Sequence, residues 1–318
     1  LPALKCVLLP SQKQLTGTEA LKALVDRGVT VEIPAEYLPP MVRQPAQGSE
    51  PVRAVVTEIQ KRTAIDGWEL TVQPDIVPGL FDSKLGGLPY WPAGLPYPTD
   101  SAGEKLILLA QIDLEQIGAE DPLPKTGLLQ FFAGRGDNFG ADWGEDTPSG
   151  FRVVWHERVD RTLTPEQVQA LGIPTHAGLD YWPVLQETAV TAQRTTTWMG
   201  PADGGFDALF AQVWEEVTGQ PPAKPDFQDF LEEPDRDYLY DQLWSSGHRL
   251  LGWPCFVQYD PRETKSPYRT LLFQLDSDWN EDETYVMWGD GGVGNFFISP
   301  ENLKRHDFSD VFYTWDCG

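Results

Sequence analysis

The chain has 318 residues, a formal net charge of −24 at pH 7 and a hydrophobic content of 41%. These values fit one large folded domain or several smaller lobes, and the negative charge excludes nucleic acid and anionic membrane surfaces as expected partners. No apolar run is long enough to span a bilayer, and three scattered cysteines without paired spacing favour a reduced, cytoplasmic location.

Residues 1–78 are predicted to form a small α/β extension. Residues 16–27 carry apolar side chains at helical spacing, and residues 29–33 alternate like a strand. Residues 52–59 and 68–73 are rich in branched and aromatic side chains at a period of two, so both are predicted to be strands.

Residues 79–160 are predicted to form a first β unit. Its opening, residues 86–98, is rich in glycine and proline and therefore cannot be helical. Three nearly continuous apolar runs follow, at residues 106–112, 128–133 and 151–156. Runs of this length and composition are typical of strands that are buried on both faces.

Residues 161–249 are predicted to form a helical insert. A capping box with Thr164 as N-cap starts a short helix, and residues 207–218 form an amphipathic one. Residues 234–246 are predicted to be a further helix, whereas the alternation in residues 184–195 predicts a long strand.

Residues 250–318 repeat the order of the first unit about 165 residues later. The matched segments are 86–92 with 251–256, 108–113 with 271–276, 127–132 with 292–297, and 151–155 with 311–315. Internal similarity in a fixed order is the mark of repeated architecture, so we predict two copies of one structural unit.

The predicted fold class is therefore α+β, mainly antiparallel β-sheet. Two pseudo-repeated β units, residues 79–160 and 250–318, are joined by the helical insert 161–249 and preceded by the extension 1–78. We expect the two units and the insert to form one compact domain.

Six segments that span about residues 80–318 carry a family resemblance. They are residues 83–89, 109–114, 124–132, 248–254, 272–278 and 288–291. Together they resemble the YwqG-like family of bacterial proteins, a domain of unknown function. The resemblance implies a β-rich mixed fold, assigns no activity or catalytic residue, and favours a protein-binding role, because such genes often lie near toxin–immunity genes. Cys255 departs from the family, which more often has aspartate there.

The acidic stretch 276–283 is the best candidate for a metal site. The candidate ligands are Asp276, Asp278, Asn280 and Asp282. Oxygen atoms at alternate positions resemble the start of a calcium loop, which makes Ca²⁺ the candidate cofactor. The EF-hand pattern fails, however, because Glu281 replaces its glycine and Met287 its bidentate glutamate. The alternative is a solvated hairpin turn.

Two Gln-x-Asp pairs stand at corresponding strand ends, Gln111 with Asp113 and Gln274 with Asp276. Because residues i and i+2 share one face of a strand, each pair points an amide and a carboxylate the same way. The pairs either line a cleft or bond the backbone that opens each unit. His248 is likewise either a binding residue or a structurally satisfied histidine.

Trp91 and Trp253 lie beside prolines in the openings of the two units. Such aromatic corners either stack on a proline-rich peptide or a sugar, or plug the end of a sheet. Both tryptophans are therefore candidate binding residues.

Three functions remain open. The first is a cytoplasmic binding protein, immunity-like or regulatory, whose acidic surface meets a basic protein partner. The second is a hydrolase or metal-dependent enzyme that uses carboxylates near Asp276 and Asp113. The third is a small-ligand or carbohydrate binder at the Trp-Pro corners. The sequence lacks Gly-x-Ser-x-Gly and His-Glu-x-x-His motifs, which favours binding over catalysis.

Overall fold

The computed structural model describes residues 46–136, 138–141, 150–179, 181–280 and 283–318. The predicted helix 16–27, the predicted strand 29–33 and the candidate ligand Asp282 lie outside the described residues. The chain divides into two units, residues 1–47 and 48–318, and the fold below is that of the second.

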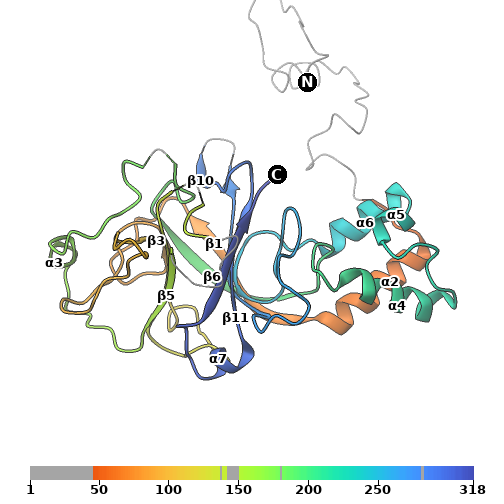
Figure 1. The fold of residues 1–318 in the computed structure, drawn as a ribbon, viewed down its shortest axis with the longest axis horizontal. Coiled ribbons are helices and arrows are strands. Elements are labelled where there is room, and N and C mark those ends of the chain that lie inside the picture. Colours follow the sequence, from red (N-terminus) through yellow and green to blue (C-terminus); the bar gives the residue numbers. More distant parts are fainter. Residues whose placement is uncertain (1–45, 137, 142–149, 180, 281–282) are drawn as a thin grey trace, which may run out of the picture. The chain divides into compact units, whose positions relative to one another are not determined.

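A ten-stranded antiparallel sheet is the main feature of residues 48–318 (Figure 1). Its strands are β1 (Ile65–Gln73), β2 (Lys84–Leu85), β3 (Ile107–Asp113), β4 (Leu128–Ala133), β5 (Phe151–His156), β6 (Thr188–Thr197), β7 (His248–Leu251), β8 (Thr270–Asp276), β11 (Val293–Ile298) and β12 (Val311–Asp316). A separate two-stranded sheet pairs β9 (Asp278–Trp279) with β10 (Thr284–Val286). An α+β fold dominated by antiparallel sheet is thus what the structure shows.

The strands lie in the order β12-β11-β8-β7-β1-β6-β2-β3-β4-β5. From either edge, four strands follow in reverse chain order before the central pair of β1 and β6 is reached. Strand β1 pairs with β7, and β6 pairs with β2, so neither central strand pairs with the strand that follows it in the chain. We call β2–β5 the first arm and β7, β8, β11 and β12 the second arm.

The sheet curls so that the inner faces of the two arms meet in the main hydrophobic core. Phe131 of β4 stacks on Phe273 of β8 with ring centroids 4.3 Å apart. At the sheet edges, Phe151 of β5 lies 5.2 Å from Tyr313 of β12. Every residue of β3 and β4 is buried, as the apolar runs 106–112 and 128–133 predicted. The same prediction is wrong for residues 151–156, because Arg152, Val154 and Trp155 of β5 are only partly buried. Strand β11 is also buried throughout.

Four helices pack around a second core and form what we call the helical lobe (Figure 1). They are α2 (Glu50–Thr63), α4 (Phe206–Thr218), α5 (Phe227–Phe230) and α6 (Glu233–Leu243). Two short helices, α3 (Pro165–Gln169) and α7 (Pro300–Lys304), complete the described fold. Within the described residues, no helix is both long and apolar enough to cross a membrane.

The predicted strand at residues 52–59 is wrong, because these residues belong to helix α2. The buried side chains are Val52, Val55, Val56 and Ile59. Their spacing of three, one and three residues is that of a helix stripe, which prevails over the strand preference of branched side chains.

Most other predicted elements are confirmed. Residues 68–73 lie in β1 and residues 207–218 in α4. The predicted helix 234–246 corresponds to α6 but ends at Leu243, and the predicted strand 184–195 corresponds to β6 but begins at Thr188. The Thr164 capping box is present, since its side chain accepts from the amide of Gln167, whose side chain in turn accepts from the amide of Thr164.

Candidate functional site

A row of buried polar side chains crosses the outer face of the first arm. Gln111 donates to two carbonyl oxygens of residues 80–82, at 2.9 and 3.0 Å, and accepts from the amide of Tyr90 at 2.9 Å. Its neighbour Gln130 donates to Gln111 and to the carbonyl oxygen of Tyr90, both at 2.8 Å. These amides therefore satisfy the backbone that opens the first arm.

The second arm makes the corresponding bonds with Gln274 and Asn295. Gln274 accepts from the amide of Cys255 at 2.7 Å and donates to the carbonyl oxygens of Ser245 and Gly247 at 3.2 and 2.7 Å. Asn295 donates to the carbonyl oxygen of Cys255 at 2.8 Å. Both predicted glutamines thus hold the opening segment of their arm.

Each polar row ends in a buried cation that the sequence reasoning missed. Lys84, beside Gln111, donates to Glu187 at 3.1 Å, and Arg249, beside Gln274, donates to the carbonyl oxygen of Ser246. Burial lowers the pKa of both Lys84 and Arg249. Their position on predicted strand openings was visible in the sequence, but their burial was not.

The carboxylates of the two Gln-x-Asp pairs also hold turns. Asp113 accepts from the amides of Glu115 and Gln116 at 3.1 and 3.2 Å and pairs with Arg161 at 2.7 Å. Asp276 accepts from the amides of Gly247 and Ser277 at 2.6 and 2.8 Å, and burial raises its pKa.

His248 uses both of its ring nitrogens. Nδ1 accepts from the amide of Asp276 at 3.0 Å, so this nitrogen carries no proton. The proton therefore lies on Nε2, which donates to Asp278 at 3.2 Å. No lone pair is left to take a proton from a substrate, which argues against a general base at this position.

The predicted calcium ligands are engaged with the protein where they are described. Asp276 and Asp278 hold the bonds above, and the side-chain oxygen of Asn280 accepts from the amide of Glu283 at 2.8 Å. In the part of the chain that the structure covers, no three His, Cys, Asp or Glu side chains are grouped to hold a metal ion. With Asp282 outside that part, calcium binding stays a prediction.

The two predicted tryptophan corners differ in exposure. Trp91 is buried in the outer face of the first arm, where its ring meets those of Tyr97 and Phe132 at 4.9 and 6.0 Å. Trp91 therefore plugs its arm. Trp253 is only half-buried and lines a pocket.

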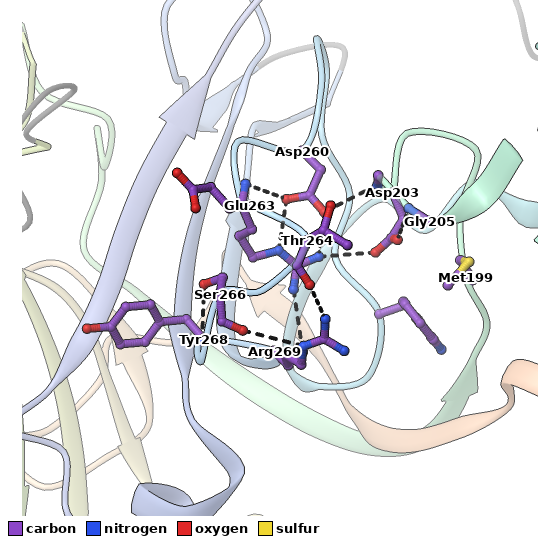
Figure 2. Close-up of a pocket in the computed structure, with 12 residues that line it drawn as sticks. Met199, Asp203, Gly205, Asp260, Glu263, Thr264, Ser266, Tyr268 and Arg269 are labelled. Atoms are coloured by element: carbon purple, nitrogen blue, oxygen red, sulfur yellow. Dashed lines mark hydrogen bonds and ion pairs between the residues drawn. The ribbon is translucent and has the colours of Figure 1, made fainter. Parts of the chain in front are cut away.

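This pocket has a volume of 330 Å³ and lies between the start of α4 and the loop 257–269. Its lining residues are Met199, Asp203, Gly204, Gly205, Trp253, Asp260, Arg262, Glu263, Thr264, Ser266, Tyr268 and Arg269. Figure 2 shows residues that precede α4 on one side and residues of the loop on the other.

The floor of the pocket is a closed ion network around Arg262. Its guanidinium donates to Asp203 at 3.1 Å and to both oxygens of Asp260 at 2.8 Å. It also lies 4.3 Å above the ring of Phe297. Burial raises the pKa of Asp203, while the amide of Gly205 and the charge of Arg262 act in the opposite direction.

The wall of the pocket is formed by Trp253, which is fixed from two directions. Its amide donates to the hydroxyl of Thr197 at 2.8 Å, and its indole Nε1 donates to the carbonyl oxygen of Thr63 at 2.5 Å. Because Thr63 ends α2, this bond ties the second arm to the helical lobe.

Comparisons with known proteins place the chain in a family without a known activity. A protein-family model described as a domain of unknown function (DUF1963) matches residues 83–317, a range that includes both arms and the pocket. The search of curated proteins returned no match.

Proposed function

This chain belongs to the DUF1963 family, a domain of unknown function, and we propose that it is a binding protein that takes a small ligand beside Trp253. The observation that carries the proposal is a preformed pocket with a fixed aromatic wall and a floor whose charged groups are paired with one another. Its volume of 330 Å³ suits a small molecule, since ligand pockets start at about 300 Å³.

The state of the other polar candidates supports binding rather than catalysis. His248 and Asp113 spend their bonding capacity on the protein itself. A catalytic base or nucleophile needs a free atom within reach of a substrate. The pocket beside Trp253 instead presents fixed side chains to solvent, where a ligand can reach them.

A fragment screen by ligand-observed NMR tests this function. We expect fragments to bind the wild-type protein and to be lost from Thr264→Trp, which fills the pocket mouth. Trp253→Leu should weaken binding, whereas the control Trp244→Leu removes an exposed indole outside the pocket and should leave binding intact. Thermal melting confirms that each variant is folded. Fragments that bind Thr264→Trp as well as wild type would contradict the proposal.

A second candidate function is binding of a basic protein partner. Trp279 is 57% exposed on β9, next to Asp278 and near Glu283. An exposed aromatic side chain among carboxylates suits a cationic surface. Affinity capture from the source cell, repeated with Trp279→Ser, tests it; a partner retained equally by both proteins would not use this surface.

We also infer that the two arms descend from one duplicated unit and that the chain is close to the YwqG-like proteins. The support is positional: Gln111 and Gln274 bond the same parts of their opening segments, and both accept from a backbone amide there. Placing the first arm's histidine and glutamine at positions 316 and 295 of the second arm tests whether the arms are equivalent.

A further inference from the structure

We propose that the ligand of this pocket is a small monocarboxylate with a flat apolar body, held by the guanidinium of Arg269 and the indole of Trp253. The inference rests on the ligand-binding function proposed above and names the chemical class of the ligand.

The two arginines of the pocket differ in what they bind. Arg262 is neutralised by Asp203 and Asp260. Arg269 donates only to carbonyl oxygens of its own loop, those of Ser266 and Thr264. No carboxylate of the described residues lies within 4.0 Å of the Arg269 guanidinium. The pocket therefore presents one guanidinium with two carboxylate partners and one without a carboxylate partner among the described residues.

The bonds that Arg269 makes also fix its direction. Its Nε and one Nη donate to the loop, and a guanidinium has five N–H groups, so about three remain for a ligand. A planar fork held in place suits the two oxygens of a carboxylate, because two parallel bonds form with little loss of side-chain freedom.

The same pocket offers little to a ligand rich in hydroxyl groups. Such a ligand needs acceptors as well as donors, but Asp260 already accepts from Arg262 and from the amide of Gly204. Asp203 accepts from Arg262 and from the amide of Gly205. The third lining carboxylate, Glu263, and the guanidinium of Arg269 are both exposed to solvent, but only Arg269 is held in place by side-chain hydrogen bonds within the described loop. The pocket thus favours an acceptor over a polyol.

Charge disfavours a ligand with two negative charges more than a ligand with one. Three carboxylates and two guanidiniums line the pocket, and the whole chain carries −24. A dianion such as phosphate is repelled by this negative charge about twice as strongly as a monoanion. A single carboxylate can form an ion pair with Arg269, which offsets the repulsion. The fixed indole of Trp253 and the thioether of Met199 then favour a flat apolar body.

Isothermal titration with matched probes tests the inference. The probes are benzoate, phenylacetate and indole-3-acetate, the corresponding primary amides, and methyl glucoside as a neutral polyol. We expect at least one carboxylate to bind about tenfold or more tightly than its amide, as a charge-assisted pair of hydrogen bonds predicts.

Two variants of the same loop separate the site from general electrostatics. Arg269→Gln should weaken carboxylate binding by about 10- to 100-fold, and Arg269→Lys should restore only part of it. Lys265→Gln removes the same charge from the same loop but does not line the pocket, so it should change affinity less than about twofold. Thermal melting confirms that the variants are folded.

The possible failures are distinct. If amides or methyl glucoside bind as well as the carboxylates, or if Lys265→Gln and Arg269→Gln lose affinity equally, the carboxylate inference is wrong while the pocket stands. The inference is also wrong if none of the three carboxylates binds but other fragments do. If no fragment binds at all, the proposed function itself fails.

Discussion

The two arms hold their opening segments in the same way but satisfy the polar atoms beneath them differently. In the first arm, the side-chain oxygen of Gln130 meets Nε2 of His156, the last residue of β5, at 3.0 Å. In the second arm, the shorter Asn295 and the last residue of β12, Asp316, take these positions. The Oδ1 atoms of Asn295 and Asp316 are buried without a hydrogen-bond partner among the described residues.

The two arms therefore differ in how fully their buried polar atoms are hydrogen-bonded within the protein. Four described residues on the strands of the second arm hold a buried polar atom without a partner, namely Arg249, Asn295, Tyr313 and Asp316, whereas the strands of the first arm hold none among the residues described. An unmet buried polar atom costs about 1–3 kcal/mol. The pocket also borders the second arm, so the buried polar atoms without partners and the candidate site belong to the same arm.

The largest expected effect is on the free energy of unfolding, when Gln130 and its counterpart Asn295 are each replaced by leucine. Gln130→Leu strands the carbonyl oxygen of Tyr90 and the ring of His156, and we expect it to lower the free energy of unfolding by about 3–5 kcal/mol. Asn295→Leu removes one bond and also one unmet oxygen, so about 1–2 kcal/mol is expected. Urea unfolding measures both, and equal losses would contradict the comparison.

The next effect is on the pH dependence of stability. Burial lowers the pKa of His156 from 6.5 to about 4. Between these values the unfolded chain binds the proton and the folded chain does not, so stability falls as the pH falls from 6.5 towards 4. The total loss is about 3 kcal/mol, at about 1.4 kcal/mol per pH unit.

In the second arm the sign is reversed, because burial raises the pKa of Asp316. Acidification towards 3.8 through its folded pKa therefore stabilises the fold at this residue. Urea unfolding at pH 7, 6 and 5 should show that His156→Gln flattens the loss and that Asp316→Asn does not. An unchanged slope in His156→Gln would show that the lowered pKa of His156 is not its cause.

Placing the side chains of the first arm in the second arm gives a smaller effect. Asp316→His removes the acceptor for the amide of Gln258, and Asn295→Gln adds a methylene, so each single variant is expected to be destabilised. Together they recreate the pair found in the first arm. We expect the double variant to be about 1–2 kcal/mol more stable than the sum of the two single losses predicts, as measured in a double-mutant cycle. Additive losses would mean that the arms are not equivalent here.

The strands were predictable from the sequence because their signals are local. Apolar runs such as those of β3 and β4 bury both faces, and Gln111 and Gln274 stand at matching places within them. A local signal for α2 was also present, in the spacing of its valines, but side-chain composition pointed to a strand.

The pocket was only partly predictable. Trp253 follows from its corner motif, yet the ion network depends on Asp203, which lies 59 residues from Arg262. Sequence spacing carries no information about a contact that the fold creates between a helix start and a distant loop. The same holds for Thr63, which fixes the indole of Trp253 from 190 residues away.

The smallest expected effect compares Gly86 of the first arm with Leu251 of the second. Gly86 follows β2 and Leu251 is the last residue of β7, and both have a left-handed backbone, with φ values of 61° and 60°. A side chain in this region costs about 1–2 kcal/mol, which buried Leu251 offsets by its packing. Once that side chain is truncated, only the backbone cost remains. Leu251→Gly should therefore be about 1 kcal/mol more stable than Leu251→Ala.

The neighbouring Leu250 provides the control, because it is fully buried and is not among the residues with positive φ. There the order should be normal, with Leu250→Ala more stable than Leu250→Gly by about 0.5–1 kcal/mol. Gly86→Ala should lower the free energy of unfolding by at least the backbone cost, because the Cβ of the new alanine would also lie 2.9 Å from the side chain of Val184. If alanine is better than glycine at position 251 as well, the second arm does not share the strained turn that glycine relieves in the first.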